Sequence, residues 1–151
     1  MKNIMKILLG LAAIILITAA PVQSQTVTKL VKDSDIEIWY VNDTITNTET
    51  GSYEFGGLLE YKGWSYSVQL VGDSISGTDS CVVYLQESNA YESSGAVWST
   101  ISSGTQEIDG AGQTTKVWSG SAWNSARMRL YVDGDGTAAT RIRAWVCFKK
   151  P

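Results

Sequence analysis

Two stretches of the chain alternate between apolar and polar residues, which is the pattern of a β-strand with one buried face. Residues 64–70 alternate aromatic and aliphatic side chains with Ser and Gln, and residues 127–132 alternate aliphatic side chains with Arg and Tyr. After residue 24, no window repeats apolar residues at helical spacing over three turns. We therefore predict a chain built from strands.

Seven further segments are predicted as strands, separated by clusters rich in Gly, Ser, Asn and Asp. They are residues 27–31, 36–41, 55–61, 81–86, 97–101, 114–118 and 141–148. Because no crossover helices are available between them, a parallel sheet is excluded. The pattern predicts one all-β domain, a single antiparallel β-sandwich of the jelly-roll kind.

The N-terminal residues differ in kind from the rest of the chain. Lys2 and Lys6 precede an almost unbroken apolar run over residues 7–20, and Pro21 follows it. A positive start, a short apolar stretch and small residues before a cut after Ser24 are typical of a secretory signal peptide. The run is shorter than the roughly 20 residues of a membrane-spanning helix, although an uncleaved N-terminal anchor stays open.

These features divide the chain into three parts. We predict a signal peptide over residues 1–24, a lead-in segment or edge strand over 25–35, and the sandwich domain over 36–151. No second long apolar stretch follows, so no membrane span is expected after cleavage of the signal peptide. The predicted location is secreted, periplasmic or at the cell surface.

Charge and composition exclude several function classes. The chain has 12 Lys and Arg against 15 Asp and Glu, a formal net charge of −3, which disfavours nucleic acid as a partner. It contains no histidine, so a Ser-His-Asp or Cys-His catalytic site cannot be built. We expect no catalytic residues and no enzyme activity.

Cys81 and Cys147 are the two cysteines of the chain. An exported protein meets oxidising conditions, where a single pair is expected to form a disulfide. The strand phase is a complication, because Cys81 shares a face with Val83 and Leu85, whereas Cys147 lies opposite the aliphatic face of its segment. A bulge would be needed to join them. The Cys81–Cys147 disulfide is nevertheless our prediction.

Asp133 and Asp135 have the spacing that opens an EF-hand calcium loop, since carboxylates one residue apart can both reach a hard cation. The rest of that loop is missing, because Thr137 stands at the next odd position and no glutamate closes it. A glycine-rich turn between two strands explains the same residues and is the favoured interpretation. Calcium bound by Asp133 and Asp135 is the alternative, and no other cofactor is expected.

Six tryptophans and seven tyrosines are the most informative feature of the composition. Flat rings on a β-sandwich can stack on sugar rings, but large aromatic residues also fill a small core. Trp64 is predicted in the core, and Trp39 and Trp98 are predicted in the core or partly buried. Trp118 and Trp123 bracket a Ser and Gly segment that is predicted as a loop, so they are the first candidates for an exposed glycan-binding patch, followed by Tyr91.

Four arginines are expected together on one face of a terminal hairpin, opposite its aliphatic side. They are Arg127, Arg129, Arg141 and Arg143. A solvated sheet face with guanidinium groups stacked on neighbouring aromatic rings would explain them. The functional alternative is recognition of a carboxylate-bearing or sulfated ligand.

Residues 82–89 (Val-Val-Tyr-Leu-Gln-Glu-Ser-Asn), Trp98, and the segments 127–132 and 141–145 together carry a resemblance. The chain resembles the small β-sandwich modules of bacterial surface proteins and of phage virion or fibre proteins, over residues 64–150. The resemblance implies a jelly roll or sandwich used for adhesion, decoration or glycan contact, with no catalytic residues. The signal peptide favours a secreted bacterial protein, because virion parts assemble in the cytoplasm.

We therefore predict an exported, non-catalytic β-sandwich that acts by surface contact, as an adhesion, scaffold or assembly module. The first alternative is a carbohydrate-binding module that uses exposed aromatic residues. The second is a phage virion-associated decoration or fibre domain. The expected partners are a cell-surface glycan, a protein, or a second copy of the chain.

Overall fold

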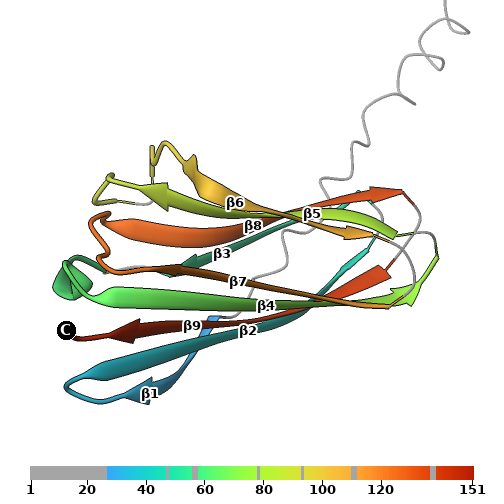
Figure 1. Cartoon of the computed structure of the whole chain (residues 1–151). Coiled ribbons are helices and arrows are strands. Elements are labelled where there is room, and N and C mark those ends of the chain that lie inside the picture. The colour runs from blue at the N-terminus through green and yellow to red at the C-terminus, as the bar shows by residue number, and fades with distance from the viewer. Residues whose placement is uncertain are drawn as a thin grey trace, which may run out of the picture.

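The computed structural model describes residues 27–46, 48–55, 58–77, 79–92, 94–109, 112–136 and 139–151. The signal peptide predicted over residues 1–24 lies outside these ranges. Strands and one short 3₁₀ helix, η1, make up most of the described chain (Figure 1). The elements are β1 (Val27–Lys32), β2 (Ile36–Thr46), β3 (Thr50–Phe55), η1 (Leu58–Tyr61), β4 (Ser65–Ser76), β5 (Asp79–Ser88), β6 (Ser99–Asp109), β7 (Gln113–Gly120), β8 (Arg127–Gly136) and β9 (Ala139–Lys149).

The strands form two antiparallel sheets that lie as two layers in Figure 1. Sheet A has the order β1-β2-β9-β4-β7, and sheet B has the order β3-β8-β5-β6. From β2 onward, every connection except that between β5 and β6 passes from one sheet to the other. This order is that of a jelly roll, so the predicted antiparallel β-sandwich is confirmed.

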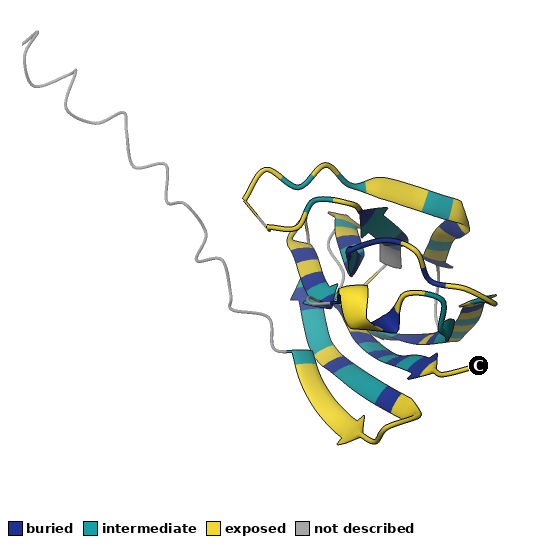
Figure 2. Cartoon of the chain, turned by 90° about the vertical axis from the view of Figure 1, so that its left-hand side faces the viewer, coloured by how far each residue is buried: buried dark blue, intermediate teal, exposed yellow. Residues whose placement is uncertain are grey.

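The core lies between the facing sides of the two sheets, where Figure 2 shows the buried stretches. In β9 every second side chain from Ile142 to Phe148 is fully buried, and β8 contributes Met128, Leu130 and Val132 in the same way. Burying each Val, Leu, Ile, Met or Phe side chain among them stabilises the fold by about 1.5–3 kcal/mol. The alternation that predicted these two strands is therefore the pattern that holds the sheets together.

One end of the sandwich is closed by η1, where the sequence predicted a strand over residues 55–61. That prediction is wrong, because β3 ends at Phe55 and η1 begins at Leu58. Residues three apart in a 3₁₀ helix lie on one side, so Leu58 and Tyr61 both reach the core. Tyr61 stacks on Phe148 with ring centroids 5.0 Å apart. No helix of the described chain is long and apolar enough to cross a membrane.

Residues 102–112 were predicted as a turn-rich loop, but β6 runs to Asp109. As an edge strand β6 has a single neighbour, β5, and Gly104 and Ile108 are its buried residues. Because so few of its residues are buried, a Ser- and Thr-rich sequence is enough to form this edge strand. The β5–β6 register is interrupted between Tyr84 and Gln86, and Ser103 takes up the irregularity with a left-handed φ of 58°.

The prediction of a Cys81–Cys147 disulfide is wrong, because the two cysteines are not joined. Cys81 lies in β5 of sheet B and is buried in the core. Cys147 lies in β9 of sheet A, between Ile38 and Ser67 on the outer side. The pairing of β9 with β2 is in unbroken register, so no bulge turns Cys147 inward. Partial burial raises the pKa of the Cys147 thiol.

Candidate functional site

Trp118 and Trp123 are both buried, so the prediction that they form an exposed patch is wrong. β7 continues to Gly120, and its alternation places Trp118 opposite Val68 on the inward side of sheet A. The indole nitrogen of Trp118 donates a hydrogen bond of 2.8 Å to the carbonyl of Ser103. Trp118 thus ties sheet A to the irregular part of β6.

Trp123 does lie in a loop, but that loop is held against the core. Its backbone N–H donates to the carbonyl of Trp64, and its carbonyl accepts from the N–H of Gly63, each at 2.8 Å. Its ring meets Tyr66 and Phe148 edge-on, with centroids 5.4 and 6.1 Å away. Neither tryptophan offers a flat face to a sugar ring. Tyr91, the third candidate, is 79% exposed.

Asp133 and Asp135 lie along one side of β8 and are both exposed. β8 and β9 belong to different sheets, so the segment between them is a connection across the sandwich rather than the predicted hairpin turn. Within the described ranges, no group of three or more Asp, Glu, Cys or His side chains could hold a metal ion. In the part of the chain that the structure describes, no third carboxylate, thiol or imidazole therefore joins the two carboxylates to form a metal site.

The same topology separates the four arginines that were expected on one face. Arg127 and Arg129 project from the outer side of sheet B, whereas Arg141 and Arg143 project from the outer side of sheet A. The expectation of a single basic face is therefore wrong. Each pair has to be considered with its own neighbours.

On sheet A, Arg143 is neutralised by a neighbouring carboxylate. Its guanidinium forms a short ion pair with Asp73, and the side-chain amide of Gln113 donates to the other oxygen of Asp73 at 2.7 Å. The hydrogen bond from Gln113, followed by the contact with Arg143, holds the pKa of Asp73 below its ordinary value. Asp73 therefore links β7, β4 and β9 on their outer side.

Asp73→Asn should lower the free energy of unfolding by about 1 kcal/mol at pH 7, because Arg143 loses its charged partner. A carboxylate whose pKa is lowered by folding stabilises the protein above its unfolded pKa, and this contribution is lost as the pH falls through the folded pKa. Urea denaturation at pH 7 and below about pH 4 should therefore show a difference from wild type that shrinks in acid. Asp109→Asn, at the exposed end of β6, is the control; a pH-independent difference would contradict the assignment.

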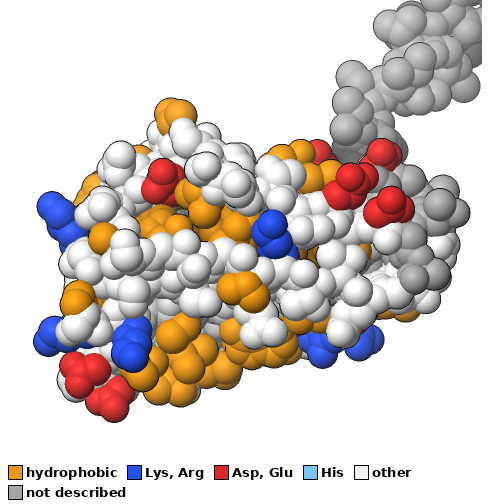
Figure 3. All heavy atoms as spheres, viewed as in Figure 1, with side chains coloured by type: hydrophobic (Ala, Val, Ile, Leu, Met, Phe, Trp, Pro, Cys, Tyr) orange, Lys and Arg blue, Asp and Glu red, His pale blue; other side chains and the backbone are white. Residues whose placement is uncertain are grey.

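The outer side of sheet A also carries an aromatic pair, which has both apolar and polar side chains around it. Tyr40 and Trp145 lie on neighbouring strands with ring centroids 5.1 Å apart. Ile38, Cys147 and the 55% exposed Val117 share this side. In Figure 3 apolar side chains gather in the lower part of the view, over β9 and β2. We call this surface the sheet A face.

The outer side of sheet B combines aromatic rings with hydrogen-bonding groups. We call the surface formed by Tyr84, Gln86, Trp98, Arg129 and Tyr131 the sheet B face. Tyr84 and Tyr131 are direct cross-strand neighbours with ring centroids 6.1 Å apart, and Gln86 stands across from Arg129. All five residues are partly exposed.

Arg129 lies at the centre of the sheet B face. Its guanidinium carbon is 4.4 Å from the ring centroid of Trp98 and 5.1 Å from that of Tyr131. Its Nε donates to the side-chain oxygen of Gln86 at 2.7 Å. Burial lowers the pKa of Arg129, although a guanidinium stays charged at any physiological pH. Stacking and the hydrogen bond together fix the orientation of the guanidinium.

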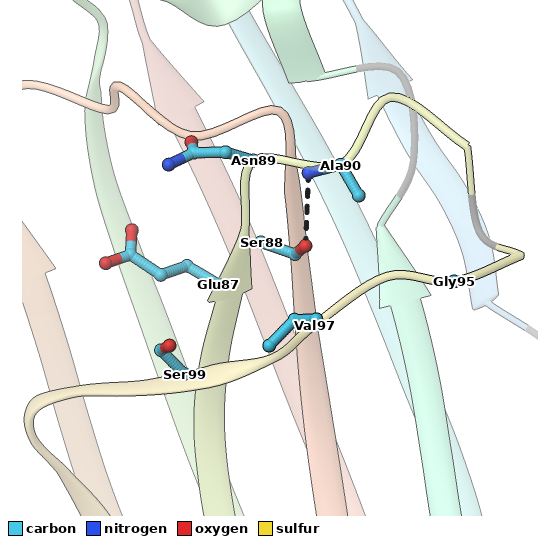
Figure 4. A pocket seen from close by; sticks show the side chains of 7 residues that line it. All are labelled: Glu87, Ser88, Asn89, Ala90, Gly95, Val97 and Ser99. Carbon is cyan, nitrogen blue, oxygen red and sulfur yellow. Dashed lines mark hydrogen bonds between the residues drawn. The ribbon is translucent and has the colours of Figure 1, made fainter.

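A pocket of ≈ 380 Å³ lies beside the sheet B face, where β5 ends and the chain returns to β6 (Figure 4). It is lined by Glu87, Ser88, Asn89, Ala90, Gly95, Val97 and Ser99. The carboxylate of Glu87 accepts a hydrogen bond from Ser125, and the hydroxyl of Ser88 accepts one from the N–H of Ala90 at 3.2 Å. Trp98 lies between two lining residues, so the pocket and the sheet B face adjoin.

Sequence reasoning missed most of the sheet B face. Tyr84 and Gln86 alternate with the buried Val83 and Leu85, a signal that could have placed them on an outer side. Trp98 was assigned to the core or to partial burial, and the structure places it, partly exposed, against Arg129. These residues meet because of the pairing of β5 with β8, which no local pattern contains.

No family model matches the chain, and no curated protein matches it. Among solved structures, the chain is similar to the Yersinia pseudotuberculosis-derived mitogen, with 14% identity, 75% of this chain and 86% of the mitogen covered, and a TM-score of 0.46. It is also similar to a Bacillus endospore appendage protein of disulfide-linked pili (10% identity, 82% and 100% covered, TM-score 0.49). A third is the C-terminal family 22 carbohydrate-binding module of a Clostridium thermocellum protein, with 16% identity, 83% of this chain and 81% of the module covered, and a TM-score of 0.43. The solved neighbours are small β-sandwich modules.

Proposed function

We propose that the chain is an exported binding module whose sheet B face recognises a carbohydrate. The observation that carries the proposal is the cluster of aromatic rings on the outer side of sheet B, where Trp98 and Tyr131 stack on the guanidinium of Arg129 and Tyr84 lies beside Tyr131. The proposal assigns a binding role to the chain rather than a catalytic one. It includes the signal peptide over residues 1–24, which would bring the domain over 36–151 to glycans outside the cell.

The chemistry of this face suits a sugar. The C–H faces of a pyranose ring are weakly apolar and pack against aromatic rings, while its hydroxyls need donors and acceptors in the plane of the ring. Gln86 supplies an amide whose nitrogen is 3.3 Å from the hydroxyl of Thr100, and Ser52 adds a hydroxyl on the other side of Arg129. Aromatic rings and hydrogen-bonding groups therefore lie side by side on the sheet B face.

The sheet A face is the weaker candidate, although it also holds an aromatic pair. Arg143 on this side is already paired with Asp73, and among the described residues no cation is stacked on Tyr40 or Trp145, whose cross-strand neighbours include Thr28 and Gln69. An adhesion or assembly role through contact with a protein would suit the sheet A face better.

Screening the purified protein on a glycan array, followed by calorimetric titration of the best ligand, tests the proposal. Trp98→Ala should weaken binding at least about tenfold, because a lost stacking contact with a sugar ring is expected to cost about 1.5 kcal/mol or more. Trp145→Ala is the matched control, since it removes the same side chain from the sheet A face.

Each outcome bears on the assignment. Loss of binding in Trp98→Ala with full binding in Trp145→Ala supports the sheet B face. Loss only in Trp145→Ala would place the site on the opposite side and overturn the assignment. Absence of any glycan ligand on a broad array would overturn the carbohydrate proposal itself.

A further inference from the structure

We propose that the sugar bound at the sheet B face is anionic, bearing a carboxylate or a sulfate, and that Arg129 contacts this group. The inference rests on the proposed function and goes beyond it, because a neutral sugar would satisfy the aromatic rings equally well.

Arg129 forms no ion pair with a described carboxylate, and the attraction from Glu54 that it feels is shared with Arg127. Glu54 is its direct neighbour across β3 and β8, but the carboxylate of Glu54 forms an ion pair of 2.8 Å with Arg127. Arg129 itself takes part in none of the ion pairs between described residues. Arg127 and Arg143, by contrast, are each neutralised. Arg129 therefore differs from both in having a charge available for a ligand.

The guanidinium of Arg129 also retains hydrogen-bonding capacity. Its Nε is used by Gln86, and one terminal nitrogen lies 3.4 Å from the hydroxyl of Ser52, which is a long contact. The second terminal nitrogen has no hydrogen-bond partner among the residues that the structure describes. A carboxylate or sulfate can accept two parallel hydrogen bonds from the terminal nitrogens of such a group.

The orientation of this group is set before any ligand binds. Trp98 and Tyr131 stack on the guanidinium, and Gln86 holds its Nε from the side. A flexible arginine loses rotamer entropy on binding, about 0.5–1.5 kcal/mol per side chain, and a preorganised one avoids most of this loss. The net charge of the chain is −3, so general electrostatic attraction does not explain binding of an anion, and the contact has to be local.

Calorimetric titration with matched pairs of sugars tests the inference. The probes are uronic-acid oligosaccharides with their carboxyl-reduced counterparts, and sulfated oligosaccharides with their desulfated counterparts. One anionic class should bind at least about tenfold more tightly than its neutral counterpart, as a charge-assisted bidentate contact predicts. The comparison within each pair uses the wild-type protein, so it does not depend on how a variant folds.

The Arg129→Gln variant then identifies the residue. It should lose the preference for the anionic sugar, so that the ratio of the anionic to the neutral affinity falls at least about tenfold, to near one. Arg141→Gln, an exposed arginine on the opposite sheet, is the control and should change neither affinity. A purely structural role for Arg129 predicts that both affinities fall together.

The possible results separate the two proposals. Equal binding of anionic and neutral sugars that still requires Trp98 would overturn this inference and leave the proposed function standing. Binding of no sugar in either class would overturn both. Tighter binding of the uronic acids, or of the sulfated sugars, supports the inference and identifies the anionic group.

Discussion

Trp123→Ala should lower the free energy of unfolding by about 3–5 kcal/mol, the usual cost of removing a large aromatic side chain from a core. The ring of Trp123 is 2% exposed and packs against Tyr66 and Phe148. Its backbone also joins the segment after β7 to residues 63 and 64 by two hydrogen bonds. The substitution leaves a cavity at the closed end of the sandwich, where η1 and this segment meet.

Urea denaturation followed by tryptophan fluorescence or circular dichroism measures the effect. Trp123→Phe keeps an aromatic ring and should recover about half of the loss. Tyr91→Ala is the matched control on the surface, and a change within about 0.5 kcal/mol is expected there. A loss below about 1 kcal/mol in Trp123→Ala would mean that the ring does not support the core.

This prediction reverses the role that the sequence suggested for Trp123. A Ser- and Gly-rich segment with polar neighbours is usually an exposed loop, and the pattern contains no sign that it closes the sandwich. The backbone of Trp123 is hydrogen-bonded to residues 63 and 64, which precede it by about 60 positions in the chain. A local sequence pattern cannot show a contact between segments so far apart. The wrong prediction for Trp118 has a similar cause, because the local pattern did not show that its strand, β7, extends two residues further than predicted.

The sequence was sufficient to predict a strand that buries one of its faces completely. Residues 127–132 alternate aliphatic side chains with Arg and Tyr, and the aliphatic side is fully buried in β8. Edge strands are different, because they have one neighbour and need few apolar residues. β6 was therefore mistaken for a loop over residues 102–109, although it pairs with β5 along most of its length.

The largest error of the sequence analysis was topological, and it concerned the candidate site directly. Treating β8 and β9 as a hairpin placed four arginines on one face, whereas the jelly-roll order puts these strands in different sheets. Consecutive strands pair in roughly two-thirds of cases, so the assumption was reasonable but did not hold here. Once the strands are separated, Arg129 emerges as the arginine that has aromatic neighbours and no carboxylate partner.

Lys29→Met should destabilise the protein by about 3 kcal/mol, because it leaves the carboxylate of Glu37 buried without its cation. Glu37 is 1% exposed and lies on the inward side of β2. Its two oxygens contact the ammonium group of Lys29 and the hydroxyl of Tyr61, which donates a short hydrogen bond. The ammonium nitrogen of Lys29 also lies 4.4 Å from the ring centroid of Trp39, a cation–π contact that helps to hold it beside Glu37.

A double-mutant cycle separates the lost ion pair from the lost packing of the lysine. Glu37→Gln keeps an acceptor for Tyr61 but removes the charge, so the combined variant Lys29→Met/Glu37→Gln should be more stable than Lys29→Met alone. Lys32→Met, an exposed position in the same edge strand, is the control, with an expected change within about 0.5 kcal/mol. If Lys29→Met costs no more than Lys32→Met in urea denaturation, the pair contributes nothing. The predicted outcome instead ties β1 to the core through a buried carboxylate, which explains how a strand exposed along most of its length remains docked at the edge of sheet A.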